Sequence, residues 1–181
     1  MGYNELFAKS FRYGMMFGKD IKPGDSVSVS VTNTNDIILA IKKAYIDMSP
    51  RTFKNSDAEE SKKSLNSEKK EKLFFELAKK IAEYMKDGAD DFEVWHYNIC
   101  DFFIKSFSAI LNEAGKNPDD ATYGKAQKII NMTFKYLYCF DDASIYAKRF
   151  EPCHMALDSY ILNWVNEWFI EQYNEGKARG E

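Results

Sequence analysis

Apolar residues recur at helical spacing through most of this chain, and this periodicity constrains its fold most strongly. One apolar stripe spans residues 73–85 and a second spans residues 92–110. Side chains three and four positions apart share one face of an α-helix, so each stripe predicts an amphipathic helix. Proline ends helices, and the four prolines fall between the periodic segments: Pro23, Pro50, Pro118 and Pro152. The sequence therefore predicts a mostly α protein, a bundle of five or six helices.

Capping residues and glycines mark where several of these helices begin and end. Thr34 or Asn35 is expected to cap one helix, because short polar side chains accept hydrogen bonds from the free amides of a first turn. Asp90 or Asp91 is expected to cap another, after Asp87-Gly88 has ended the helix before it. Helices are expected over these approximate ranges: 4–18, 34–48, 73–86, 91–111, 120–138 and 155–173.

One short segment has the period of a β-strand instead. Val27, Val29 and Val31 alternate with serines, after a turn predicted at Pro23-Gly24-Asp25. Strict alternation over five residues predicts a strand, but an isolated strand needs a partner. We expect one short β-strand or hairpin near the N-terminus, which pairs either within the chain or with a second copy.

Length and composition limit the number of domains and the kind of partner. The chain has 181 residues, so we expect a single helical domain over 1–181. Residues 51–72 are almost all polar and are expected to form a mobile connection or a solvated helix start. The formal net charge of −3 excludes a uniformly basic nucleic-acid coat protein, although a local basic face stays compatible with it.

Charge and cysteine content suggest an intracellular protein with two electrically different ends. Residues 1–55 contain eight basic and five acidic side chains, whereas residues 91–181 contain nine and 14. The three cysteines are widely spaced and odd in number, which does not fit a disulfide framework. Charged residues interrupt the apolar segment near Met15, and no apolar run is long enough for a membrane span. A cytoplasmic location without membrane attachment is the expectation.

A lysine stripe offers the first candidate binding surface. Lys125, Lys128 and Lys135 gather on one face of a predicted helix, with Gln127 and Asn131 beside them. Lysines along one helix face can follow the phosphates of DNA or RNA. The stripe is therefore a candidate surface for nucleic acid or for an acidic protein partner, and an ordinary solvated helix face is the alternative.

A second pattern, Arg149 followed by His154, resembles the R-x4-H signature of HEPN ribonucleases, which are all-α proteins. The resemblance implies that His154 acts in acid–base catalysis on an RNA 2′-hydroxyl while Arg149 stabilises phosphate charge. Pro152 lies between the two and departs from a smooth helix start. A ribonuclease that uses these two residues is an alternative function.

A zinc site is the third chemistry considered. His96 and Cys100 stand four positions apart on one helix, and Cys153 and His154 complete a Cys2His2 set. Adjacent residues rarely both reach one tetrahedral metal, and buried cysteines are common without any metal. The sequence therefore predicts no metal and no cofactor.

The last predicted helix is unusually rich in large apolar residues. Trp164, Trp168 and Phe169 extend its apolar face beyond what one core requires. Because tryptophan is enriched in protein–protein interfaces, these residues are the candidate interface of a homodimer.

Residues 123–162 are similar to a pattern found in small uncharacterised helical proteins of bacteria and mobile elements. The similarity rests on Tyr123–Lys128, Asn131, Lys135–Leu137 and Cys153-His154, followed by Leu157-Asp158 and Ile161-Leu162. Gln127, Asn131, His154 and Asp158 would suit a buried polar network between the last two helices.

In size and helical character the chain also resembles anti-CRISPR proteins, small inhibitors carried by phages and mobile elements. The resemblance implies a non-enzymatic protein that binds an RNA-guided nuclease, its nucleic acid, or both. The channels of such nucleases are basic, which an acidic protein can exploit. The predicted function is therefore an anti-CRISPR-type inhibitor, with the ribonuclease and a lysine-stripe nucleic-acid-binding module as alternatives.

Overall fold

The computed structural model describes residues 28–48, 60–154, 166–167 and 170. These ranges are mostly helical, which confirms the predicted mostly α character, and no strand occurs within them. The helices with their bounds are α2 (Thr34–Asp47), α3 (Glu60–Asp87), α4 (Phe92–Glu113), the 3-10 helix η3 (Pro118–Asp120), α5 (Tyr123–Leu137), the 3-10 helix η4 (Ala143–Tyr146) and α6 (Ala147–Phe150).

Three of the helices begin at side-chain caps. Asn33 caps α2, Asp91 caps α4 and Thr122 caps α5, and each accepts a hydrogen bond from an amide of the first turn. The prediction of a cap at Asp90 or Asp91 is confirmed. The α2 cap lies just before the predicted Thr34 or Asn35, because Asn33 is still extended whereas Thr34 is already helical. η3 takes up the predicted start of the α5 helix, so α5 itself begins at Tyr123.

The turn between α3 and α4 depends on one glycine. Gly88 follows the last residue of α3 and has a φ of 82°, a conformation that glycine adopts without the steric cost of a side chain. The Arg149 guanidinium occupies the space where a Cβ of residue 88 would stand. Its Nη2 donates a hydrogen bond to the carbonyl of Lys86 at 3.4 Å. The predicted helix end at Asp87-Gly88 is confirmed, and the arginine covers it.

The polar segment predicted over residues 51–72 is helical from Glu60 onward, where it forms the first turns of α3. Residues 51–59 lie outside the described part of the chain. The charged side chains here reach neighbouring helices, as the ion pair between Lys42 of α2 and Glu71 shows at 2.6 Å. The apolar stripe that the sequence indicated begins at Leu73, which is buried.

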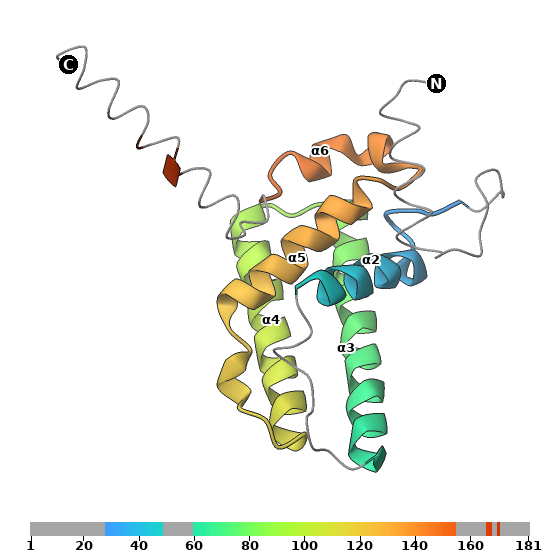
Figure 1. The fold of residues 1–181 in the computed structure, drawn as a ribbon. Helices are drawn as coiled ribbons and strands as arrows, with labels where there is room; N and C mark the ends of the chain where they lie inside the picture. The colour runs from blue at the N-terminus through green and yellow to red at the C-terminus, as the bar shows by residue number, and fades with distance from the viewer. Residues whose placement is uncertain (1–27, 49–59, 155–165, 168–169, 171–181) are drawn as a thin grey trace.

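The helices form a layered bundle. α3 and α4 run side by side in opposite directions, and α2 and α5 lie across them (Figure 1). α6 lies at the end of the bundle where α3 turns into α4, so that Arg149 can reach Gly88. Helix α5 packs against α4 and runs toward α6, so side chains along α5 can contact both helices.

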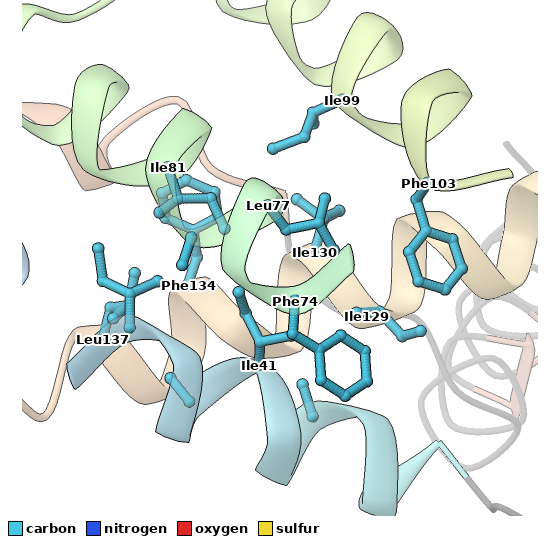
Figure 2. Packing of buried hydrophobic residues seen from close by; sticks show 14 of the residues in the cluster. Ile41, Phe74, Leu77, Ile81, Ile99, Phe103, Ile129, Ile130, Phe134 and Leu137 are labelled. Atoms are coloured by element: carbon cyan, nitrogen blue, oxygen red, sulfur yellow. The ribbon is translucent and has the colours of Figure 1, made fainter. Parts of the chain in front are cut away.

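Apolar side chains from four helices meet inside this arrangement. Figure 2 shows Ile41 of α2, Leu77 of α3, Phe103 of α4 and Ile130 of α5 within one cluster, and all four are fully buried. The stripes at 73–85 and 92–110 supply much of the cluster, as their periodicity predicted. Burial of about 25 cal/mol per Å² of apolar surface makes this cluster the main source of stability.

Aspartates hold the segment before α2. Asp141 Oδ2 accepts a hydrogen bond from the Val29 amide at 3.0 Å, and Asp142 Oδ1 accepts one from the Val31 amide at 2.9 Å. The predicted strand Val27–Val31 begins outside the described residues and stays a prediction. In its described part, carboxylates take the amide hydrogens that a strand partner would take.

Some predictions concern residues outside the described ranges. They are the helix over 4–18, the helix over 155–173 apart from residues 166–167 and 170, the position of Asp158, and the dimer interface at Trp164, Trp168 and Phe169. None of the described helices is long and apolar enough to cross a membrane.

Candidate functional site

A pocket of about 310 Å³ lies between α5 and the end of α6. Helix α5 contributes residues at the i, i+3, i+4 and i+7 positions of one face, and the segment after η4 closes the other side. We call this hollow the α5–α6 pocket; it is lined by Asn131, Phe134, Lys135, Tyr138, Phe150, Cys153 and His154. Asn131 and Lys135 of α5 thus share one hollow with Cys153 and His154, which lie about 20 residues later in the chain.

The walls of the pocket are aromatic. Phe150 makes edge-to-face contacts with Tyr138 at 5.3 Å and with Phe134 at 6.3 Å between ring centroids. Phe134 is buried and also packs against Tyr84 of α3 and Trp95 of α4. Its ring is therefore fixed by three other elements. Tyr138, at the C-cap of α5, is 65% exposed and forms the open rim.

A buried hydrogen-bonded pair lies beneath the polar end of the pocket. His96 of α4 is 1% exposed, and its Nε2–H donates to Asn131 Oδ1 at 2.9 Å. Cys100 Sγ lies 4.0 Å from the other ring nitrogen, Nδ1. Burial lowers the pKa of His96, an effect that its hydrogen bond to Asn131 opposes. The neutral imidazole is thus the form that the bundle stabilises.

His154 connects this buried pair to the surface. Its ring centroid lies 4.6 Å from that of His96, and it packs edge-to-face on Phe92 at 5.6 Å. Its Nε2–H donates to Glu93 Oε1, in the first turn of α4, at 2.8 Å. A carboxylate therefore fixes the orientation of the imidazole that lines the pocket.

The structure divides the predicted lysine stripe. Lys135 lines the pocket and is exposed, whereas Lys125 Nζ donates to the carbonyl of Asp120 at 2.8 Å. Lys128 and Gln127 are half-buried and do not line the pocket. Within the described residues, neither Lys128 nor Lys135 forms an ion pair. Of the stripe and its neighbours, only Lys135 and Asn131 belong to the pocket.

Arg149 and His154, the pair that resembles the ribonuclease signature, contact different parts of the bundle. The Arg149 side chain covers Gly88 and the end of α3, while its carbonyl accepts a hydrogen bond from Tyr84 Oη at 2.7 Å. His154 lies against Glu93 and lines the pocket, which Arg149 does not. Arg149 thus has a defined structural contact at the end of α3.

The four residues considered for zinc come closer together than their spacing in the sequence suggests, but no group of three metal-ligating side chains forms within the described residues. His96 and His154 are neighbours, whereas the Cys153 thiol donates to the carbonyl of Arg149 at 3.3 Å. Burial raises the pKa of both the Cys100 and the Cys153 thiol to about 12. Both thiols are therefore protonated at neutral pH.

The expected polar network between Gln127, Asn131, His154 and Asp158 takes another form. Asn131 and His154 both line the pocket, and each contacts His96 of α4. Gln127 is not part of this contact in the described structure, and Asp158 lies outside the described residues. Sequence reasoning also missed the aromatic walls. The i, i+3, i+4, i+7 pattern from Asn131 to Tyr138 was the signal that could have indicated them.

Comparisons with known proteins add no relative. The chain matches no protein-family model, and no similar curated protein or solved structure was found.

Proposed function

We propose that this chain is a non-enzymatic binding protein whose contact surface is the α5–α6 pocket together with Lys128 and Lys135 beside it. The observation that carries the proposal is the convergence of a lysine, an oriented imidazole and an exposed tyrosine around one hollow. Binding sites typically combine an apolar hollow with a few polar groups that fix the orientation of the ligand.

The state of the nearby reactive groups favours binding over catalysis. A thiol nucleophile acts as a thiolate, and burial raises the pKa of Cys153, the thiol of the pocket, to about 12. The imidazole of His96 is buried and bonded to Asn131, so it has no access to a bound substrate. These groups support the structure of the pocket.

The partner that fits best carries negative charge. Lys135 adds positive charge at the pocket and Lys128 lies two turns before it on α5, although the chain as a whole has a net charge of −3. An RNA-guided nuclease together with its nucleic acid is the specific partner that we propose, in line with the resemblance to anti-CRISPR inhibitors. The oligomeric state and a homodimer through Trp164, Trp168 and Phe169 stay predictions.

The test is an affinity pull-down from bacterial lysate, with and without nuclease treatment. The wild-type chain is compared with Lys135→Glu, which reverses the charge at the pocket, and with Lys72→Glu as a matched control. Lys72 is exposed and lines a hollow between α3 and α4, away from the pocket. We expect capture of a partner that Lys135→Glu abolishes and Lys72→Glu preserves. Equal capture by both variants would contradict the proposal.

A ribonuclease is the second candidate, and one contact favours it. Glu93 orients His154 as a carboxylate orients a catalytic imidazole, at 2.8 Å. The position of Arg149 at the end of α3 leaves this imidazole without the proposed phosphate partner. RNA cleavage by the purified protein that disappears in His154→Ala would favour the ribonuclease and count against a non-enzymatic protein.

A further inference from the structure

The aromatic walls of the α5–α6 pocket suit a flat group. Phe150 and Tyr138 stand edge-to-face at 5.3 Å between ring centroids, and Phe134, which contacts Phe150, also lines the hollow. Tyr138 is exposed over 65% of its surface, so most of its ring is open to a ligand. Aromatic rings of this kind provide stacking surfaces for nucleobases, and every base has a π-face that can use them.

The charge beside these rings is placed for phosphate. Lys135 is three positions before Tyr138, the C-cap of α5, so the two residues share one helix face, and both line the pocket. Lys128 lies two turns before Lys135, about 10 Å along the helix axis at 1.5 Å per residue. Both lysines lack an ion-pair partner among the described residues. Two lysines along the helix can thus bind successive phosphates of a nucleic-acid strand while one of its bases enters the pocket.

The polar end of the pocket offers a fixed hydrogen-bonding group. Glu93 Oε1 accepts the hydrogen bond that His154 Nε2–H donates, which leaves the other ring nitrogen, Nδ1, for a ligand. An oriented imidazole beside stacking surfaces is the kind of group that reads the edge of an unstacked base.

We infer that the α5–α6 pocket binds a nucleotide, with its base against Tyr138 and Phe150 and its phosphate at Lys135. The inference rests on the proposed function because it names the ligand of the same pocket. A base inside a duplex is stacked and cannot enter a hollow of this kind, so the ligand is a free nucleotide or a nucleotide of a single strand.

The test measures fluorescence anisotropy of a labelled single-stranded oligonucleotide with the full-length protein. An unlabelled single strand, a duplex of the same sequence and a free mononucleotide serve as competitors. We expect the single strand to bind more tightly than the duplex. If the mononucleotide competes as well as the unlabelled single strand at the same concentration, free nucleotides are the ligand. If only the single strand competes, single-stranded nucleic acid is the ligand.

Variants at the exposed rim separate the stacking and charge contributions. Tyr138→Ala should weaken binding about tenfold, whereas Tyr138→Phe keeps the ring and should preserve it. Lys135→Gln should lower the slope of log affinity against log salt concentration by about 0.7, since one phosphate contact is lost. A merely structural role of these residues would not change the salt slope. The melting temperature of each variant shows that it is folded.

The inference and the proposed function fail in different ways. Equal binding by Tyr138→Ala and wild type, or duplex binding as tight as single-strand binding, would overturn the nucleotide inference. A second result would also overturn the nucleotide inference: a protein is captured after nuclease treatment, its capture depends on Lys135, and no oligonucleotide binds. The proposed function would then still hold. That result would indicate an acidic peptide as the occupant. Capture that does not depend on Lys135 would contradict the proposed function itself.

Discussion

The α5–α6 pocket differs from the hollows between α3 and α4 in construction more than in size. One of these α3–α4 hollows, of about 370 Å³, is lined by Leu73, Phe102 and Ile110 among others, and a second of about 320 Å³ lies nearer to Gly88. The α5–α6 pocket measures about 310 Å³. All three are thus large enough for a small ligand, so volume alone does not identify a site.

The polar groups of the two regions have different partners. At the α3–α4 hollows, Lys69 pairs with Glu113, an ion pair between partly exposed side chains. Exposed pairs of this kind contribute about 0–1 kcal/mol. At the α5–α6 pocket, the buried His96 bonds to Asn131, and Glu93 orients His154. The comparison shows that fixed polar groups around a hollow, and not its volume, identify a candidate site.

Loss of the buried aromatic ring that lines the α5–α6 pocket should lower the stability of the protein most. Phe134→Ala removes a ring that is 3% exposed and touches Tyr84, Phe92 and Trp95. We expect the free energy of unfolding to fall by about 3–5 kcal/mol. Phe102→Ala, at the wall of an α3–α4 hollow, should cost clearly less because Phe102 is only half-buried. Urea denaturation measures both, and equal losses would contradict the distinction between the two regions.

Removal of the buried amide should give an intermediate effect. Asn131→Ala leaves the Nε2–H group of His96 buried without its acceptor, which costs about 1–3 kcal/mol. The matched control is Asn98→Ala, an exposed asparagine that lines the smaller α3–α4 hollow. That variant should stay within about 0.5 kcal/mol of wild type. Chemical denaturation of the pair tests the comparison, and similar values for both variants would break it.

The smallest effect concerns pH. Burial lowers the pKa of His96 below its ordinary value of 6.5, so the unfolded chain takes up this proton at a higher pH than the folded chain does. Stability linked to His96 is therefore fully present above pH 6.5 and is lost as the pH falls below it. The slope from one proton is at most about 1.4 kcal/mol per pH unit.

His96→Gln keeps an amide donor for Asn131 and removes the titrating group. The loss of stability between pH 7.5 and pH 5.5 should become smaller in this variant than in the wild-type chain. Urea midpoints across this range measure the slope, which is independent of any constant cost of the substitution. An unchanged slope would show that His96 is not the titrating group.

Much of the fold was accessible from sequence because its signals are local. The apolar stripe beginning at Leu73 predicted a helix with a buried face, and Gly88 marked its end. The acidic Asp91 predicted the start of the next helix. By contrast, the polar stretch from Glu60 to Lys72 fits both a mobile connection and the start of a helix, so its sequence does not predict how far the helix extends. Its charged side chains make helix-to-helix ion pairs that local pattern does not reveal.

The candidate site was accessible only in fragments. The sequence singles out Lys135 as part of a lysine stripe and His154 as part of the ribonuclease signature. It places Asn131 and His154 together only in an expected polar network with Gln127 and Asp158, which does not include the aromatic walls. Nothing in the sequence singles out Glu93, because the helix dipole alone explains an exposed glutamate in the first turn of a helix. Its role depends on a contact with a residue 61 positions away.

The sequence by itself determined the helices, their caps and the apolar faces that they bury. These features depend on backbone propensity and on spacing of three or four residues, which any segment carries with it. Only the tertiary structure decided that α5 lies against both α4 and the end of α6. This placement joins His96 to Asn131 and Glu93 to His154, and it turns Arg149 toward the α3–α4 turn. Such contacts depend on how whole helices pack, and side-chain spacing along one helix carries no information about them.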